Sequence, residues 1–411
     1  MPRAHVLLSE AIHESADDAF IRADITVHRT AAGLAGDELI AALQAIPGDE
    51  PVMLGIRSKT KVRAPVFEEV PRLVAVGAFC IGTDQIDLDV AHERGVAVFN
   101  APFSNTRSVA ELVIAEVVML SRQIFPRSWG AHDGAWHKDA KGAHEVRGKT
   151  LGIIGYGHIG SQLSVLAEAM GLRVLYYDVV SKLPLGNASA VDDLDTLLAE
   201  SDFVTLHVPD TELTRNMIRA EQLAKCKPGA YVINASRGSV VDLEALRDAI
   251  VEGRIGGAAI DVYPKEPKAA GDRFESPLQG LRNVILTPHI GGSTQEAQAN
   301  IGREVSDVLS AYVSFGRTSA CLTLPQIDAA ALEPGRCRLL NVHRDVPGVL
   351  SRVNNVVAEV GVNISGQHLV TSGGTGLLLM DIDVPRDDAR ASALRDGIAG
   401  LDQSLRTRLI G

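Results

Sequence analysis

The 411-residue chain lacks the patterns that mark a metal centre, a membrane anchor or a disulfide framework. Its four cysteines are scattered without the short spacings of zinc sites, so we expect reduced thiols and no bound metal. The longest apolar stretch, Leu112 to Leu120, is too short to cross a bilayer and is interrupted by Glu116. The sequence therefore predicts a soluble protein without a metal site.

Basic charge is also scarce. The formal net charge is -11, whereas proteins that bind nucleic acid or an anionic membrane surface usually carry a dense basic face. We therefore expect neither partner. The first ten residues lack the apolar core of a signal peptide, which predicts a cytoplasmic location. An anionic substrate would have to be met by a local cluster of Arg and Lys.

A stretch in the middle of the chain, residues 150–178, has the order strand, glycine turn, helix and second strand ending in an acid. Gly155, Gly157 and Gly160 fit G-x-G-x-x-G, in which the first glycine allows a sharp turn, the second lets a pyrophosphate approach and the third allows close packing. Asp178 follows at the spacing of an acid that binds ribose hydroxyls, and its charge would repel a 2'-phosphate. The stretch predicts a Rossmann-type domain that binds NAD rather than NADP.

Polar side chains follow the later strands of the same unit. Because the ends of neighbouring parallel strands converge on one crevice, we expect these side chains to lie together. They are His207 with Val208 and Pro209, Asn234 with Ala235, Ser236 and Arg237, Asp261 with Glu266, and His289 with Ile290, Gly291 and Gly292.

Hydride transfer between a secondary alcohol and a nicotinamide requires a base and an anchor for the substrate. His289 is the best base, because imidazole titrates near neutral pH. Glu266 is the best partner to orient it. Arg237, in Asn-Ala-Ser-Arg-Gly, is the best clamp for a carboxylate beside the reacting carbon.

The first hundred residues alternate strand-like and helix-like runs, which predicts a further α/β unit. One strand ends in Arg57-Ser58-Lys59, where Arg57 offers a fork for a carboxylate or phosphate and Ser58 and local N–H groups support it. Asn105 lies at the change of domain, where it suits either a helix cap or a cofactor contact. The polar residues 130–147 predict an extended arm, in which Lys138 is a candidate phosphate contact.

The pattern changes after a polar linker at 323–336. Strand, helix, two strands, helix and strand follow one another, which is the ferredoxin-like βαββαβ arrangement. We expect a separate small domain without a catalytic constellation.

Four motifs resemble the D-2-hydroxyacid dehydrogenase family: Gly155-Tyr-Gly-His-Ile-Gly160, Asn234-Ala-Ser-Arg-Gly-Ser-Val-Val-Asp242, Asp261-Val-Tyr-Pro-Lys-Glu-Pro267 and Thr287-Pro-His-Ile-Gly-Gly-Ser-Thr294. Residues 99–110 and the C-terminal domain resemble the shorter bacterial branch that oxidises 3-phosphoglycerate to 3-phosphohydroxypyruvate at the start of serine biosynthesis. The resemblance implies a discontinuous flavodoxin-like substrate domain at 1–104 and 294–330, a Rossmann domain at 105–293 and an ACT regulatory domain at 337–411.

The resemblance also implies roles for individual residues. Arg237, Glu266 and His289 match the family's catalytic residues, and Arg57, Ser58, Lys59 and Lys138 are candidates for binding the substrate's phosphate and carboxylate. The residues that match cofactor contacts or flank them are Asn105, Gly155, Gly157, His158, Ile159, Gly160, Asp178, His207, Val208, Pro209, Ala235, Ser236, Arg237, Asp261, His289, Ile290, Gly291 and Gly292.

The C-terminal domain is expected to bind L-serine as an inhibitor through His343, Asp345 and Asn363. The family commonly has Asn where this chain has Asp345, and a carboxylate there would repel serine's own carboxylate. We therefore expect serine inhibition to be weaker or altered. Trp136 matches an arm residue that packs across a subunit boundary, and the family resemblance implies a homotetramer.

Two alternatives remain open. One is another enzyme of the same chemistry, which reduces glyoxylate, hydroxypyruvate or 2-oxoglutarate. 2-Oxoglutarate is also a plausible side substrate of an enzyme that acts on 3-phosphoglycerate. The basic cluster of Arg57, Lys59 and Lys138 favours a phosphorylated substrate. The other alternative is a non-catalytic NAD-sensing protein of the corepressor kind, which the complete set of His289, Glu266 and Arg237 disfavours.

Overall fold

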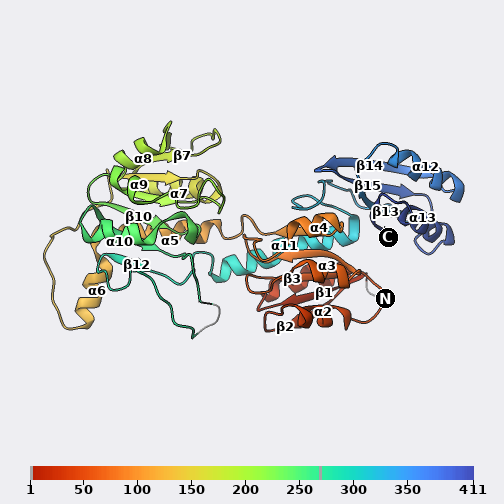
Figure 1. The fold of residues 1–411 in the computed structure, drawn as a ribbon, viewed down its shortest axis with the longest axis horizontal. Coiled ribbons are helices and arrows are strands. Elements are labelled where there is room, and N and C mark those ends of the chain that lie inside the picture. Colours follow the sequence, from red (N-terminus) through yellow and green to blue (C-terminus); the bar gives the residue numbers. More distant parts are fainter. Residues whose placement is uncertain (1–2, 268–270) are drawn as a thin grey trace. The chain divides into compact units, whose positions relative to one another are not determined.

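The computed structural model describes residues 3–267 and 271–411. The chain divides into two compact units. The first unit consists of two separate ranges, Met1–Ser104 and Gln298–Gly411, and the second unit is the range between them, Asn105–Ala297. Figure 1 shows helices covering the sheets of both units. Within the described ranges, no helix is long and apolar enough to cross a membrane.

The first unit contains a five-stranded parallel sheet in the order β2-β1-β3-β4-β5, which is the flavodoxin-like order and confirms that expectation. The strands are fully or partly buried runs of four to six residues, as parallel sheets covered on both faces require. They are β1 (Ala4–Ser9), β2 (Ile25–Thr30), β3 (Val52–Ile56), β4 (Leu73–Ala78) and β5 (Ala97–Asn100). The helices between them are α1 (Asp17–Arg22), α2 (Asp37–Gln44), α3 (Ala64–Glu69) and α4 (Leu88–Glu93).

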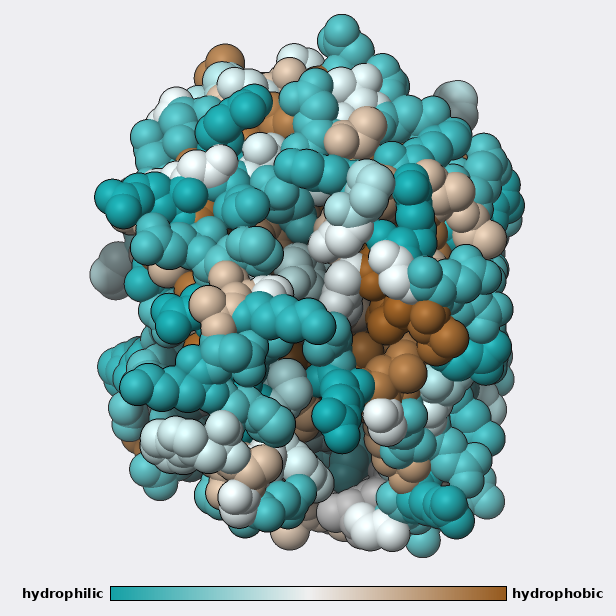
Figure 2. Space-filling model, turned by 90° about the vertical axis from the view of Figure 1, so that its left-hand side faces the viewer, coloured by the Kyte–Doolittle hydropathy of each residue, from teal (hydrophilic) through white to brown (hydrophobic). Residues whose placement is uncertain are grey.

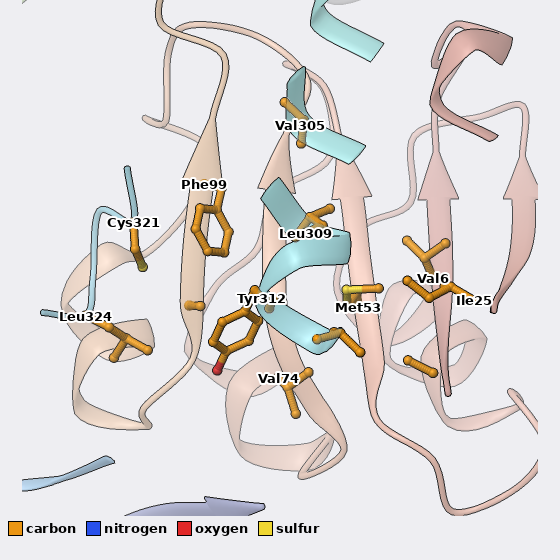
Figure 3. Packing of buried hydrophobic residues seen from close by; sticks show 14 of the residues in the cluster. Val6, Ile25, Met53, Val74, Phe99, Val305, Leu309, Tyr312, Cys321 and Leu324 are labelled. Carbon is orange, nitrogen blue, oxygen red and sulfur yellow. The ribbon is translucent and has the colours of Figure 1, made fainter. Parts of the chain in front are cut away.

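A long helix, α11 (Gln295–Phe315), returns the chain to this sheet and makes the first unit discontinuous. Figure 3 shows Leu309 and Tyr312 of α11 lying against Met53, Val74 and Phe99 of the sheet. All five side chains are at most 5% exposed. The helix is thus held by its apolar face rather than by local propensity.

The second unit is built on a seven-stranded parallel sheet in the order β12-β11-β10-β9-β6-β7-β8, so the order reverses between β6 and β9 as in a Rossmann fold. The strands are β6 (Thr150–Ile154), β7 (Arg173–Tyr177), β8 (Ser189–Ala190), β9 (Phe203–Leu206), β10 (Ala230–Asn234), β11 (Ile255–Ile260) and β12 (Val284–Leu286). One hydrophobic cluster lies under α5 (Thr106–Arg122) and α7 (His158–Ala169), and another under α8 (Leu194–Glu200), α9 (Ala220–Lys225) and α10 (Leu243–Val251).

The C-terminal part of the first unit is a four-stranded antiparallel sheet in the order β14-β15-β13-β16, which confirms the predicted βαββαβ arrangement. One face packs under its two helices, and apolar residues of β13, β15 and β16 join the hydrophobic cluster that contains α11. Arg408 of β16 donates to the carbonyls of Tyr312 and Val313 at the end of α11. The elements are β13 (Cys337–Arg344), α12 (Val349–Val360), β14 (Ile364–Ser372), β15 (Thr375–Ile382), α13 (Ala389–Ala399) and β16 (Ser404–Ile410).

One helix occupies part of the segment predicted to be an extended arm. Helix α6 (Ile124–His132) includes Gly130, and residues 133–149 beyond it contain no helix or strand. Gln123 ends α5 with a left-handed φ of 53°, and Pro126 lies in the first turn of α6, where a missing backbone N–H costs no hydrogen bond. The proline therefore does not prevent the helix.

Candidate functional site

The glycine turn after β6 has the backbone geometry that a dinucleotide fold requires. Gly155 has a φ of 92°, and a Cβ atom there would lie 2.5 Å from the carbonyl oxygen of His207. A Cβ on Gly160 would collide with the carbonyl oxygen of Gly155. By contrast, a Cβ on Gly157 would meet no described atom within 4 Å, so the chain leaves open space directly before α7. This space is where a pyrophosphate would approach the backbone.

Helix α7 begins at His158, immediately after Gly157, and continues through Ile159 and Gly160. Its N-terminus carries the positive end of the helix dipole and is suited to an anion. These residues and the open space at Gly157 fit the pyrophosphate of NAD.

Asp178 lies at the carboxyl end of β7 and is fixed by the backbone. Its carboxylate accepts hydrogen bonds from the N–H of Tyr156 at 2.8 Å and of Val180 at 3.0 Å. The acid is therefore held beside the glycine turn, which suits acceptance of ribose hydroxyls and disfavours a 2'-phosphate.

Asp261, at the end of β11, organises the loop that follows β12. It is 1% exposed, and its carboxylate accepts the N–H of Ile290 and of Gly291, each at 2.8 Å, and the hydroxyl of Thr287 at 2.6 Å. His289 has a left-handed φ of 55° within this loop. One buried carboxylate thus fixes the backbone that carries the histidine.

Asn105 lies against the same loop. It precedes α5 but makes no side-chain cap, and a Cβ on Gly292 would lie 2.5 Å from its amide nitrogen. Of its two proposed roles, capping is therefore not observed, and its side chain instead faces the Gly292 backbone.

His289 and Glu266 form a hydrogen-bonded ion pair at the surface of the second unit. The Nδ1 of His289 lies 2.9 Å from both carboxylate oxygens of Glu266. The histidine side chain is 53% exposed, so a small molecule can reach it. The arrangement brings together two residues that are 23 positions apart in the sequence.

The pair shifts the titration of both groups. The hydrogen bond to Glu266 raises the pKa of His289 above its ordinary value, and this effect exceeds the opposing effect of burial. Burial alone would raise the pKa of Glu266, but the hydrogen bond and the charge of His289 lower it overall. The pair therefore favours a carboxylate beside an imidazole that readily binds a proton.

Arg237 follows β10 and lies near this pair, since its positive charge lowers the pKa of both His289 and Glu266. Its guanidinium donates to the carbonyl of Ser236 at 2.8 Å, and its own carbonyl accepts from the side chain of Asn234 at 3.0 Å. The structure therefore assembles Arg237, Glu266 and His289 at one edge of the sheet, as parallel strand ends dictate.

His207, at the end of β9, is unsuited to proton transfer near neutral pH. Burial lowers its pKa to about 3, and its Nε2 lies 3.0 Å from the hydroxyl of Thr205. It remains a neutral neighbour of Gly155, followed by Val208 and Pro209. Ala235 and Ser236 lie in the turn after β10, where the side chain and N–H of Ser236 donate to Asn234.

Arg57, Ser58 and Lys59 form a loop at the end of β3 in the first unit, with Ser58 and Lys59 exposed. The N–H groups of Arg57 and Lys59 donate to the carboxylate of Glu10. Lys138 is exposed in the irregular segment after α6 in the second unit. These two N–H groups are therefore engaged, whereas the exposed side chains of Ser58 and Lys59 are available to an anion. One nitrogen of the Arg57 guanidinium donates to the carbonyl of Ala11 at 3.2 Å, so this residue would meet an anion with its other N–H groups.

Among the described residues, no hydrogen bond joins the three residues expected to bind serine, although the charge of Asp345 acts on His343 and partly opposes the lowering of its pKa by burial. His343 is 4% exposed, and its ring lies 3.0 Å from the side chain of Asn341 and against Gly376. Asp345 and Asn363 are exposed, and Asn363 donates to Asp383 at 2.7 Å. A serine site would have to use Asp345 and Asn363 from the surface.

Two residues near the site were not predicted. Thr287 donates to Asp261, and Glu116 of α5 is 2% exposed, with burial and the charge of Asp261 raising its pKa to about 8. Asn234, which was expected among the polar residues at the strand ends, donates to the carbonyl of Arg237 and so holds that turn. Thr287 lies inside a motif whose other members were selected, and its position at a strand end was its signal. The only signal for Glu116 was an acid inside an apolar helix.

Comparison with known proteins agrees with this geometry. The model of the D-isomer specific 2-hydroxyacid dehydrogenase NAD binding domain matches residues 114–291, and that of an AHAS small subunit-like ACT domain matches residues 339–401. The solved D-lactate dehydrogenase from Aquifex aeolicus, complexed with NAD and lactic acid, has a TM-score of 0.64 at 27% identity and covers 78% of this chain and 100% of its own.

Relatives of similar length are more alike in sequence. D-3-phosphoglycerate dehydrogenase of Dictyostelium discoideum is 46% identical over 405 residues, which cover 98% of this chain and 97% of the relative. The same enzyme of Escherichia coli K12 is 46% identical over 404 residues, with the same two shares. The chain is an NAD-dependent dehydrogenase. It belongs to the D-isomer specific 2-hydroxyacid dehydrogenase family and, within it, to the D-3-phosphoglycerate dehydrogenases.

Proposed function

We propose that this chain oxidises D-3-phosphoglycerate to 3-phosphohydroxypyruvate with NAD, the first step of L-serine biosynthesis. The observation that carries the proposal is the His289–Glu266 pair, with Arg237 close enough to influence both, beside a loop pinned by Asp261. Relatives that bear the name of this activity are 46% identical over nearly the whole chain.

His289 is the proposed base. Because its Nδ1 faces the Glu266 carboxylate, Nδ1 carries the proton and Nε2 presents the lone pair to the substrate hydroxyl. NAD, when bound, accepts the hydride from the carbon that bears that hydroxyl. Glu266 stabilises the imidazolium that forms, and Arg237 holds the adjacent carboxylate by a bidentate contact.

The distal phosphate is assigned to the side chains at the end of β3, namely Arg57 and Lys59 with the hydroxyl of Ser58. Lys138, in the second unit, is kept as a separate candidate for binding an anion. Because charge dominates this recognition, a dicarboxylic 2-oxo acid such as 2-oxoglutarate is a proposed side substrate. It also carries an anionic group at each end, with a carboxylate in place of the phosphate.

L-Serine is the proposed effector of the C-terminal domain, through Asp345, Asn363 and the strand that carries His343. Asp345 is exposed at the end of β13, and its backbone N–H donates to the carbonyl of Gly374 at 2.9 Å. The position therefore presents a carboxylate to a ligand that itself carries one, which is expected to weaken binding.

A homotetramer is the proposed assembly. Figure 2 shows a largely hydrophilic face interrupted by a hydrophobic area. A separate observation is that two large aromatic side chains of the second unit are exposed: Trp129 of α6 is 64% exposed, and Trp136, in the segment after this helix, is 85% exposed. Exposed aromatic side chains of this size favour burial against a second subunit.

Replacing His289 with Ala tests the proposed base. Turnover of 3-phosphoglycerate should fall by at least about 100-fold, because the base is lost, while NADH binding measured by fluorescence should stay near wild type. His132→Ala, which removes an exposed histidine of α6, is the control. Turnover retained by His289→Ala would remove the base assignment.

A further inference from the structure

The loop that carries Arg57 and Lys59 is organised around a carboxylate from another strand. Glu10 follows β1, and the loop follows β3, its direct parallel neighbour. In the strand order β2-β1-β3-β4-β5 the direction of winding reverses between β1 and β3. Ligands of open α/β sheets bind outside the carboxyl ends of the strands at such a reversal. Glu10 therefore lies where a ligand is expected.

Three backbone N–H groups of the loop donate to this one side chain. One carboxylate oxygen of Glu10 accepts the N–H of Arg57 at 2.9 Å and of Thr60 at 3.0 Å, and the other accepts the N–H of Lys59 at 3.2 Å. Glu10 is 8% exposed and Thr60 is fully buried. A ring of N–H groups of this kind is what commonly binds a phosphate in proteins. Here a resident carboxylate occupies it.

Additional contacts fix the loop from other sides. The hydroxyls of Ser9 and Thr60 lie 3.0 Å apart, and the side chain of Gln85 donates to the carbonyl of Arg57 at 2.9 Å. Glu10 itself has a left-handed φ of 72°, a conformation that costs a non-glycine residue roughly 1–3 kcal/mol. The three hydrogen bonds offset that strain, so the backbone at Glu10 and the loop define each other's shape.

This geometry determines how an anion can be recognised. The N–H groups of Arg57, Lys59 and Thr60 are engaged, so a substrate's distal anion meets side chains: the guanidinium of Arg57, the hydroxyl of Ser58 and the ammonium of Lys59. The position of the charged group at the end of a long cationic side chain depends on how firmly the backbone of that residue is fixed. The direction in which Arg57 and Lys59 leave the loop depends on Glu10.

We propose that Glu10 is a positioning residue of the substrate site: its carboxylate fixes the loop at residues 57–60 so that Arg57 and Lys59 bind the distal phosphate of the substrate. The inference rests on the proposed function and extends it, because it names the residue that sets the preference for a phosphorylated over an unphosphorylated 2-hydroxy acid. Glu10 does not contact the reacting atoms.

The test is steady-state kinetics of Glu10→Gln with two substrate pairs. Gln keeps the size of the side chain but removes the charge and one of the two accepting oxygens, which weakens charge-assisted hydrogen bonds. The KM for 3-phosphoglycerate should rise about tenfold or more, as expected for the loss of one such bond, with kcat and the KM for NAD nearly unchanged. The ratio of kcat/KM for 3-phosphohydroxypyruvate to that for hydroxypyruvate should fall by a similar factor.

Asp202→Asn is the matched control. Asp202 also accepts a backbone N–H, that of Thr150 at the start of β6 at 2.9 Å, and it pairs with Lys227, but it lies in the second unit and holds none of the proposed substrate residues. Its KM values should stay at wild type. If Glu10→Gln fails to fold, Glu10→Asp, which keeps the charge but shortens the reach, should raise the same KM to a lesser degree.

The outcomes separate the two proposals. Wild-type turnover of 3-phosphoglycerate reports on the proposed function, and its absence would overturn that function and the phosphate role of the loop together. With wild-type turnover present, an unchanged KM in Glu10→Gln, or an equal loss for phosphorylated and unphosphorylated substrates, would overturn the positioning role alone.

Discussion

The protonation state of His289 determines which direction of the proposed reaction the enzyme can catalyse. Oxidation of the hydroxy acid needs a neutral imidazole, so its rate should increase as pH rises through the pKa of His289, which Glu266 raises. In Glu266→Gln the carboxylate is lost, so this limb of the kcat/KM profile should move to lower pH. The maximal rate should drop on the order of 100-fold, because the imidazolium loses its stabilising charge.

The measurement is the pH profile of NADH formation for both enzymes. Reduction needs the protonated imidazole, so its rate falls as the pH rises. In the variant this fall should begin at a lower pH than in the wild type. A limb that stays in place would mean that another group is the base. Asp261, whose carboxylate is fully used by Thr287 and two backbone N–H groups, is a poor substitute.

Glu116 predicts a pH dependence of stability. Burial, with the nearby charge of Asp261, raises its pKa from 4.5 to about 8, so between these values the folded protein holds a proton that the unfolded chain releases. Stability should therefore fall as pH rises through this window, by up to a few kcal/mol. Neither carboxyl oxygen has a hydrogen-bond partner among the described residues.

Replacing Glu116 with Gln removes this titration. The unfolding midpoint of the wild type should drop between pH 6 and pH 8 (roughly the upper half of the window), and that of Glu116→Gln should drop less. Glu111→Gln is the control, because Glu111 is an exposed residue of the same helix paired with Arg107. Equal slopes for wild type and Glu116→Gln would show that Glu116 is already ionised in the folded state.

At the scale of elements, the start of α7 allows cofactor binding and folding to be separated. Gly157 has an extended backbone and open space where a Cβ would stand, whereas Gly155 has a left-handed φ and a carbonyl at 2.5 Å. Gly157→Ala should fold with an unchanged unfolding midpoint but bind NADH at least about tenfold more weakly, because the methyl group occupies the pyrophosphate's approach. Gly155→Ala should lose stability itself.

Calorimetry of unfolding and titration with NADH distinguish these two effects. Tight NADH binding by Gly157→Ala would place the pyrophosphate elsewhere.

The sequence predicted the sheets better than the helices around them. Strands β6 and β7 were predicted because buried parallel strands are continuous apolar runs, and the glycine turn marked the place where α7 begins. Helix α6 was missed because its nine residues include a proline and a glycine, which usually interrupt a helix, and because none of its residues is buried, although Phe125 and Trp129 contact each other one turn apart. Its start depends on the left-handed Gln123.

The sequence did not predict the contacts between residues that follow different strands. The motifs proposed His289, Glu266 and Arg237 as a group, and the structure brings them together. Nothing in the sequence indicated that Glu10 would bond to a loop 47 residues away. That pairing depends on β1 and β3 being neighbours, which only the folded sheet establishes.

At the scale of the whole molecule, we expect an effector bound to the C-terminal sheet to change the rate of turnover. Replacing Asp345 with Asn restores an amide that both donates and accepts, so serine should inhibit Asp345→Asn at least about tenfold more tightly than the wild type. Serine titration of the initial rate measures this, with Asp387→Asn as the exposed control in the same domain. An unchanged inhibition constant would remove Asp345 from the effector site.

NADH absorbance identifies the substrate. The purified protein is mixed with NAD and 3-phosphoglycerate, and with NADH and 3-phosphohydroxypyruvate, alongside the unphosphorylated acids. We expect turnover in both directions, with the phosphorylated pair as the preferred substrates. Turnover of hydroxypyruvate or glyoxylate without turnover of either phosphorylated acid would contradict the proposed substrate and keep only the hydride chemistry of the family.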